Sequence, residues 1–132
     1  MTKKEVDNFE KYQSQLEGLL SEIGMLAKKS PNDGVNKFKL KFINEVVNES
    51  NTILGDNYKP FDSFKEFDEN DVPTNSDVTF IISQYLNCFE KLRSDNIYYD
   101  KKIEGSKNVY YWFWVIDGKK SDIKTSEPNK IK

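Results

Sequence analysis

An unbroken run of aromatic and β-branched residues constrains this chain more than any other feature. It covers residues 109–116 and consists of Val-Tyr-Tyr-Trp-Phe-Trp-Val-Ile. Such a composition is typical of a β-strand, in which alternate side chains point to opposite faces. Because both faces of this strand are apolar, one must be covered by the core of the chain and the other by a second layer or a partner.

The alternation of side chains assigns the run to two faces, which carry Val109, Tyr111, Phe113 and Val115 on one side and Tyr110, Trp112, Trp114 and Ile116 on the other. We expect helices of the chain to cover the first face, and the tryptophan face to need separate cover. The long N-terminal helix folded over the sheet, or helices on both of its sides, would supply that cover. The alternative is a recognition or dimer surface, because Trp and Tyr are common interface anchors.

Three upstream segments have the apolar spacing of amphipathic helices, and we predict helices over residues 4–29, 35–54 and 76–94. The break at residues 30–34 is short, so the first two helices should form an antiparallel hairpin. The third helix is apolar over much of its circumference and should be central to the core. In the second helix, the predicted buried stripe carries Val35, Phe38, Phe42, Val46 and Ile53, and Ile43 and Val47 widen it.

The remainder of the chain predicts a β-meander. Strands are expected over residues 97–103, 109–116 and 119–125, and Asp117-Gly118 is a strong signal for a two-residue hairpin turn. Residues 126–132 are expected to fray. The predicted fold class is therefore α+β, with three helices and a small antiparallel meander in a single domain over residues 1–132.

Residues 56–73 form an acidic segment with two prolines. We predict an ordered loop, with one short helical turn, whose phenylalanines dock on the helices and whose acids face water. Asp68, Glu69 and Asp71 lack the central glycine and distal glutamate of a calcium loop, so no metal site is predicted. An acidic surface that engages a basic partner is the alternative interpretation.

The chemical inventory argues against catalysis. The chain has no histidine, its one cysteine is Cys88, and its glycines are scattered singly, which leaves no phosphate-binding loop. Arg93 is the only arginine, so bidentate carboxylate or phosphate clamps are almost excluded. We therefore expect neither an enzyme nor a cofactor. No window reaches the length of an apolar membrane span, and we expect a cytoplasmic protein.

These observations favour a non-catalytic protein that binds another protein, as an inhibitor, immunity protein or complex subunit of bacterial or phage origin does. The candidate contact residues are on the sheet and in the acidic loop: Tyr98, Tyr110, Trp112, Trp114, Asp68, Glu69 and Asp71. One alternative is a homodimer through the N-terminal helix or the tryptophan face. Another is a winged-helix-like nucleic-acid binder that uses Lys101, Lys102 and Lys107.

Overall fold

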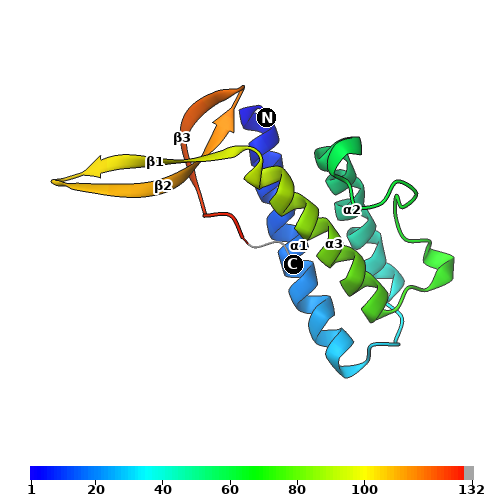
Figure 1. Cartoon of the computed structure of the whole chain (residues 1–132). Coiled ribbons are helices and arrows are strands. Elements are labelled where there is room, and N and C mark those ends of the chain that lie inside the picture. The colour runs from blue at the N-terminus through cyan, green and yellow to red at the C-terminus, as the bar shows by residue number, and fades with distance from the viewer. Residues whose placement is uncertain (130–132) are drawn as a thin grey trace.

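The computed structural model describes residues 1–129. Three helices are followed by a three-stranded antiparallel sheet, which confirms the predicted α+β class (Figure 1). The helices are α1 (Lys3–Lys29), α2 (Lys37–Tyr58) and α3 (Asn75–Ser94), with a single 3-10 turn, η1 (Glu69–Asp71), before α3. The strands are β1 (Ile97–Glu104), β2 (Lys107–Ile116) and β3 (Lys119–Thr125). Within residues 1–129, no helix has both the length and the apolar character that crossing a membrane requires.

Local side-chain chemistry determines where the helices begin. Thr2 and Thr74 each form a capping box, with Glu5 at the start of α1 and with Asp77 at the start of α3. The Asn36 side chain accepts a hydrogen bond from the Lys39 backbone N–H at the start of α2. These bonds satisfy backbone N–H groups that the first helical turn leaves unpaired.

The three helices enclose one apolar core. α1 and α2 run antiparallel, and α3 lies against both of them (Figure 1). The fully buried side chains of this core include Phe9, Leu16 and Ile23 from α1, Leu40, Ile43 and Val47 from α2, and Val78, Ile82, Tyr85 and Phe89 from α3. The seam of the N-terminal helix is therefore occupied by this chain's own helices.

The predicted stripe of α2 was partly wrong. Phe38 is 74% exposed and Phe42 is 46% exposed, and their rings pack edge to face with centroids 5.1 Å apart. The face that meets the core is centred on Ile43 and Val47, which the prediction placed at the margin of the stripe, and on Leu40, which the prediction did not include. Two overlapping stripes fit the same periodicity, and packing against α1 and α3 selects the aliphatic one.

Helix α2 extends past its predicted end at residue 54 to Tyr58, and from residue 59 onward the acidic segment before α3 is an ordered loop, as predicted. The Asn44 side chain on α2 accepts a hydrogen bond from the Phe67 N–H and donates one to the Phe67 carbonyl, both at 2.9 Å. Phe67 is buried, and Phe61 stacks on Phe80 of α3. The loop therefore docks through its phenylalanines, while Asp68, Glu69 and Asp71 are exposed.

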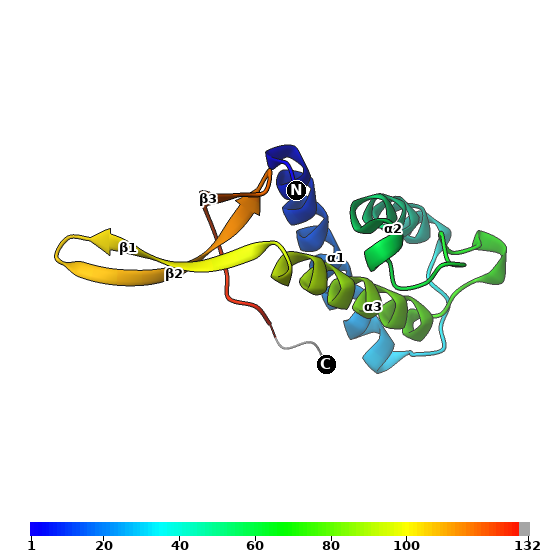
Figure 2. The same ribbon diagram turned by 45° about the horizontal axis from the view of Figure 1, so that its top comes forward.

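The sheet is a meander with the strand order β1-β2-β3. Asp117 and Gly118 have φ angles of 53° and 71°, as the predicted two-residue turn between β2 and β3 requires. The hairpin of β1 and β2 projects well beyond the helices, and only its base lies beside them (Figures 1 and 2). This projection decides which aromatic side chains are covered.

The segment after β3 is anchored by Arg93, a residue that is only 2% exposed. The guanidinium forms a bidentate ion pair with Glu90 and also donates to Thr125 Oγ1 and to the Ser126 and Glu127 carbonyls. The prediction that the C-terminal segment frays was therefore wrong for residues 126–129. Residues 130–132 lie outside the described part of the chain.

Candidate functional site

The tryptophan face of β2 is covered by helices at its base. Trp114 has no exposed surface, and its ring meets Phe9 of α1 edge to face at 5.2 Å. Phe9 in turn stacks on Phe89 of α3 at 4.8 Å. The Trp114 indole N–H donates to Glu10 Oε1 at 3.0 Å. The N-terminal helix therefore covers this part of the face, and Trp114 is unavailable as a surface residue.

The opposite face of β2 is covered by the sheet's own side chains, so the expectation that helices would cover it was wrong. Phe113 is 4% exposed and stacks on Tyr98 at 5.5 Å. Lys102 and Lys120 place their ammonium groups over the Phe113 and Tyr98 rings, respectively. Alternation along the strand identifies two faces but does not say which one meets the helices.

Hydrogen bonds complete the cover of this opposite face. The Tyr98 hydroxyl donates to the Ser121 carbonyl, and partial burial together with nearby carboxylates raises the pKa of Tyr98. The Tyr111 hydroxyl donates to Glu104 Oε1 at 2.7 Å, and this bond raises the pKa of Tyr111. Lys124 Nζ lies 3.8 Å from the centroid of the Tyr111 ring. The candidate contact residue Tyr98 therefore belongs to this self-covered face.

The outer part of the tryptophan face extends beyond the helices and is open. We call it the aromatic patch, and it consists of Tyr99 and Ile103 on β1 and Tyr110 and Trp112 on β2. Tyr99, Ile103 and Tyr110 are 56%, 74% and 55% exposed, and Trp112 is half-buried. The ring of Tyr99 lies 5.4 Å from Tyr110 and 5.3 Å from Trp112, measured between centroids. These contacts hold the three rings of the patch against one another.

Two patch residues, Tyr99 and Ile103, were not among the predicted contact residues. The alternation of β1 could have placed them on the tryptophan face, because Tyr99 pairs with Trp112 and Ile103 with Asn108. Their exposure depends on how far the hairpin projects, which no local pattern specifies.

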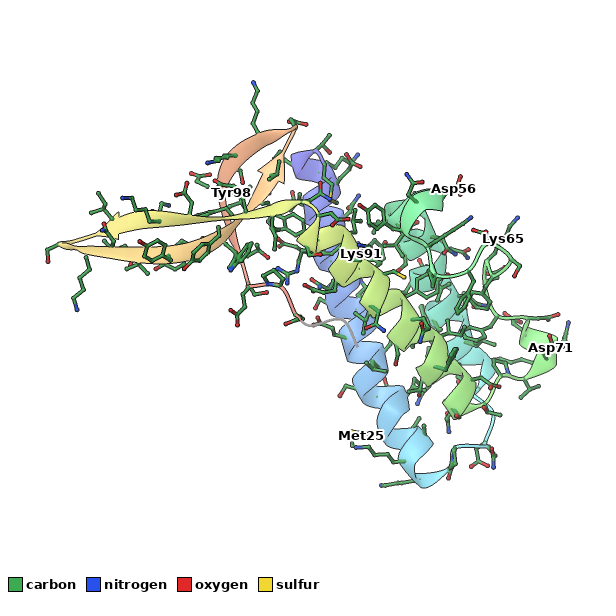
Figure 3. The ribbon with its side chains drawn as sticks, viewed as in Figure 1. Met25, Asp56, Lys65, Asp71, Lys91 and Tyr98 are labelled. Atoms are coloured by element: carbon green, nitrogen blue, oxygen red, sulfur yellow. The ribbon has the colours of Figure 1, made fainter. Side chains whose placement is uncertain are left out.

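The acidic loop and the aromatic patch lie at opposite ends of the molecule. Figure 3 shows Asp71 on the far side of the helices from Tyr98, which lies near the base of the hairpin. The structure therefore does not bring Asp68, Glu69 and Asp71 together with Tyr110 and Trp112. Among the described residues, no three acidic or cysteine side chains are placed to hold a metal ion.

The lysines of the nucleic-acid alternative lie on the hairpin. Lys101 shares a face with the patch, Lys102 is on the self-covered face, and Lys107 pairs with Glu104 at the tip. No residue from 81 to 90 in α3 is fully exposed, and the hairpin points away from this helix (Figure 2). The three lysines are therefore not gathered on one face of the hairpin.

Comparisons of the chain with protein-family models, with curated proteins and with solved structures find no match. The aromatic patch is accordingly the surface from which a function is best argued.

Proposed function

We propose that this chain is a non-catalytic, cytoplasmic protein-binding protein that docks a protein partner through the aromatic patch. The observation that carries the proposal is the exposure of Tyr99, Tyr110 and Ile103 on a hairpin that projects beyond the helices. Two stacked tyrosines and a half-buried tryptophan form the kind of rigid aromatic group that anchors interfaces.

The location of the patch supports this role. The base of the same sheet face is fully packed, with Trp114 buried against α1, so the fold does not need the outer aromatic side chains for its core. Exposed apolar groups of this size are a liability in solution unless they have a binding role. A partner that covers them would recover roughly 1.5–3 kcal/mol for each large side chain that becomes fully buried.

The acidic loop would act as a separate contact. Asp68, Glu69 and Asp71 are exposed at the far end of the helices from the hairpin. A partner that used both surfaces would have to extend along the whole length of the molecule. We therefore assign the main binding role to the patch and an auxiliary, electrostatic role to the loop.

A photo-crosslinking residue at position 110 tests this assignment. Tyr110→benzoylphenylalanine places the reactive group in the patch, and Phe38→benzoylphenylalanine places it on an equally apolar but separate surface of α2. Irradiation of native cells should give one discrete adduct from position 110 and not from position 38. The same set of adducts from both positions, or none from position 110, would contradict the proposal.

Substitution of the patch provides the matching loss of binding. Tyr110→Ser should weaken binding of the crosslinked partner by about thirtyfold or more, since truncation of an interface anchor typically costs about 2 kcal/mol or more. Phe38→Ser, with the same change of side chain outside the patch, should bind as the parent chain does. If the parent, Tyr110→Ser and Phe38→Ser chains bound the partner with equal affinity, the patch would not be part of the interface.

A further inference from the structure

The outer edge of β1 is a regular strand edge. All eight residues of β1 pair with β2 in continuous register, from Ile97 opposite Trp114 to Glu104 opposite Lys107. Among residues 1–129, no other strand lies along the outer side of β1. The other edge of the sheet, β3, is interrupted by a register shift opposite the segment between Phe113 and Val115. Because a bulge blunts an edge and a regular strand does not, β1 is the edge that can accept another strand.

The turn at the hairpin tip determines which backbone groups of β1 point outward. Glu104 and Lys107 flank a two-residue turn and pair with each other, so the even-numbered residues of β1 face β2. Tyr99, Lys101 and Ile103 therefore present their N–H and C=O groups to the outside. In agreement, the Lys101 N–H is bonded to the Asp100 side chain, at 2.8 Å, and not to β2.

We propose that two copies of this chain associate through their β1 edges, in antiparallel register with Lys101 on the two-fold axis. In this register Asp100 lies opposite Lys102 of the second copy, twice in each dimer, and Tyr99 lies opposite Ile103 of the second copy. Opposite charges placed across a strand pair are favourable, and an aromatic side chain opposite a β-branched one is also favourable.

Charge complementarity selects this register over its neighbours. The two neighbouring registers place the two-fold axis at residue 100 or at residue 102. In the first, Asp100 lies opposite Asp100 of the second copy, and in the other, Lys102 lies opposite Lys102 of the second copy. Like charges directly opposite each other destabilise a strand pair. Lys101 opposite itself at the axis is the one unfavourable pair that remains, and it makes the proposed dimer weaker than it would otherwise be.

The dimer would enlarge the aromatic patch. A two-fold axis perpendicular to the sheet keeps equivalent faces on the same side, so the patches of both copies become one band across the four central strands of a six-stranded sheet. The two helical bodies would lie at the two ends of this band. The dimer does not require the proposed partner, because its backbone hydrogen bonds run along the edge of β1, although Tyr99 and Ile103 belong both to this edge and to the patch.

Sedimentation velocity of the full chain, from low to high micromolar concentration, tests the association. We expect a concentration-dependent dimer in which hydrogen exchange of the Tyr99, Lys101 and Ile103 amides slows. The amides of β3 should exchange at the same rate in monomer and dimer. A chain that stays monomeric at the highest concentration, or a dimer whose protection falls on β3 or the helices, would overturn the proposal.

A charge swap tests the register. Asp100→Lys alone and Lys102→Asp alone should each weaken the dimer by about tenfold, because each creates two like-charge pairs. The double variant should recover the parent affinity, which also shows that the substituted hairpin folds. Lys65→Asp, an equal change of charge in the loop at the other end of the molecule, should have no effect.

Lys101→Thr provides a test in the opposite direction. Removing the like-charge pair at the axis should tighten the dimer several-fold, since threonine also suits a strand. A Lys101→Thr chain that dimerises more weakly than the parent would exclude this register. So would an Asp100→Lys, Lys102→Asp double variant whose dimer affinity is no higher than that of either single variant.

Discussion

The Trp114 indole N–H donates to Glu10 Oε1 at 3.0 Å and so joins the sheet to the first helix. Glu10→Ala removes the acceptor and leaves the indole N–H of a fully buried tryptophan unpaired. An unsatisfied buried donor costs about 1–3 kcal/mol, and we expect the free energy of unfolding to fall by that amount. Urea denaturation followed by tryptophan fluorescence measures it.

Glu17→Ala is the matched control for this prediction. Glu17 is exposed on the same helix and has no hydrogen-bond partner among the described side chains. This substitution should change stability by less than about 0.5 kcal/mol. Equal losses in the two variants would show that the bond to Trp114 is not the cause.

Asn44 connects the acidic loop to α2 through two bonds to the Phe67 backbone. Asn44→Ala leaves the buried Phe67 N–H and C=O without these partners, so stability should fall by about 2 kcal/mol. The amides of residues 65–71 should also exchange faster with solvent. Asn48→Ala is the control, because it removes an exposed bond to Glu66 and should have a small effect on both measurements.

The features that were predictable from sequence are those that depend on neighbouring residues. The start of α3 at Thr74 and the turn at Asp117 follow from capping and turn chemistry within four residues. The docking of the loop phenylalanines was also predictable, because an acidic segment with regularly spaced apolar side chains has few other ways to bury them.

The assignment of the sheet faces could not be predicted, because it depends on how the hairpin joins the helical body. The Asp117 N–H donates to the Met1 carbonyl and the Val115 N–H to the Asn96 carbonyl, and these contacts orient the base of β2. That orientation turns Trp114 inward and leaves Tyr110 outside. Of the predicted contact residues, the structure therefore places Tyr110 and Trp112 in one patch and separates the others from it.

Arg93 donates to five acceptors and is the only arginine of the chain. Arg93→Lys keeps the charge but cannot reproduce the planar fork, so the bonds to Ser126 and Glu127 should be lost. We expect a loss of about 1–3 kcal/mol in stability, because buried acceptors lose their hydrogen bonds while the charge opposite Glu90 is kept. Limited proteolysis should cut the segment after β3 faster than in the parent chain.

A second variant removes the negative charge of the ion pair and keeps the arginine. Glu90→Gln keeps a carbonyl acceptor for Arg93 but removes the negative charge, and its stability should fall as well. If Arg93→Lys were as stable as the parent chain, the hydrogen bonds of the Arg93 guanidinium would not contribute to the stability of the fold.

Two glycines should respond in opposite ways to alanine. Gly118 has a φ of 71° in the turn between β2 and β3, where a Cβ is unfavourable, so Gly118→Ala should lower stability by about 1–2 kcal/mol. Gly18 lies within α1, and an added Cβ would meet no heavy atom within 4 Å. Gly18→Ala should therefore raise stability by about 0.5–1 kcal/mol. Thermal melts of the two variants measure the direction of each change in stability. A Gly118→Ala chain more stable than the parent would contradict the positive φ of Gly118 in this turn.

Cys88 lies half-buried on α3, and burial raises the pKa of its thiol. Because the thiolate is the reactive form, alkylation by iodoacetamide should be slower in the folded chain, and the midpoint of its pH profile should lie above the value in denaturant. A raised folded-state pKa also means that stability falls as the pH rises from the ordinary thiol pKa through the raised one. The Cys88→Ser chain lacks this thiol, so its stability should decline less over that range. Identical alkylation profiles in the folded and denatured chain would show that the thiol is not desolvated.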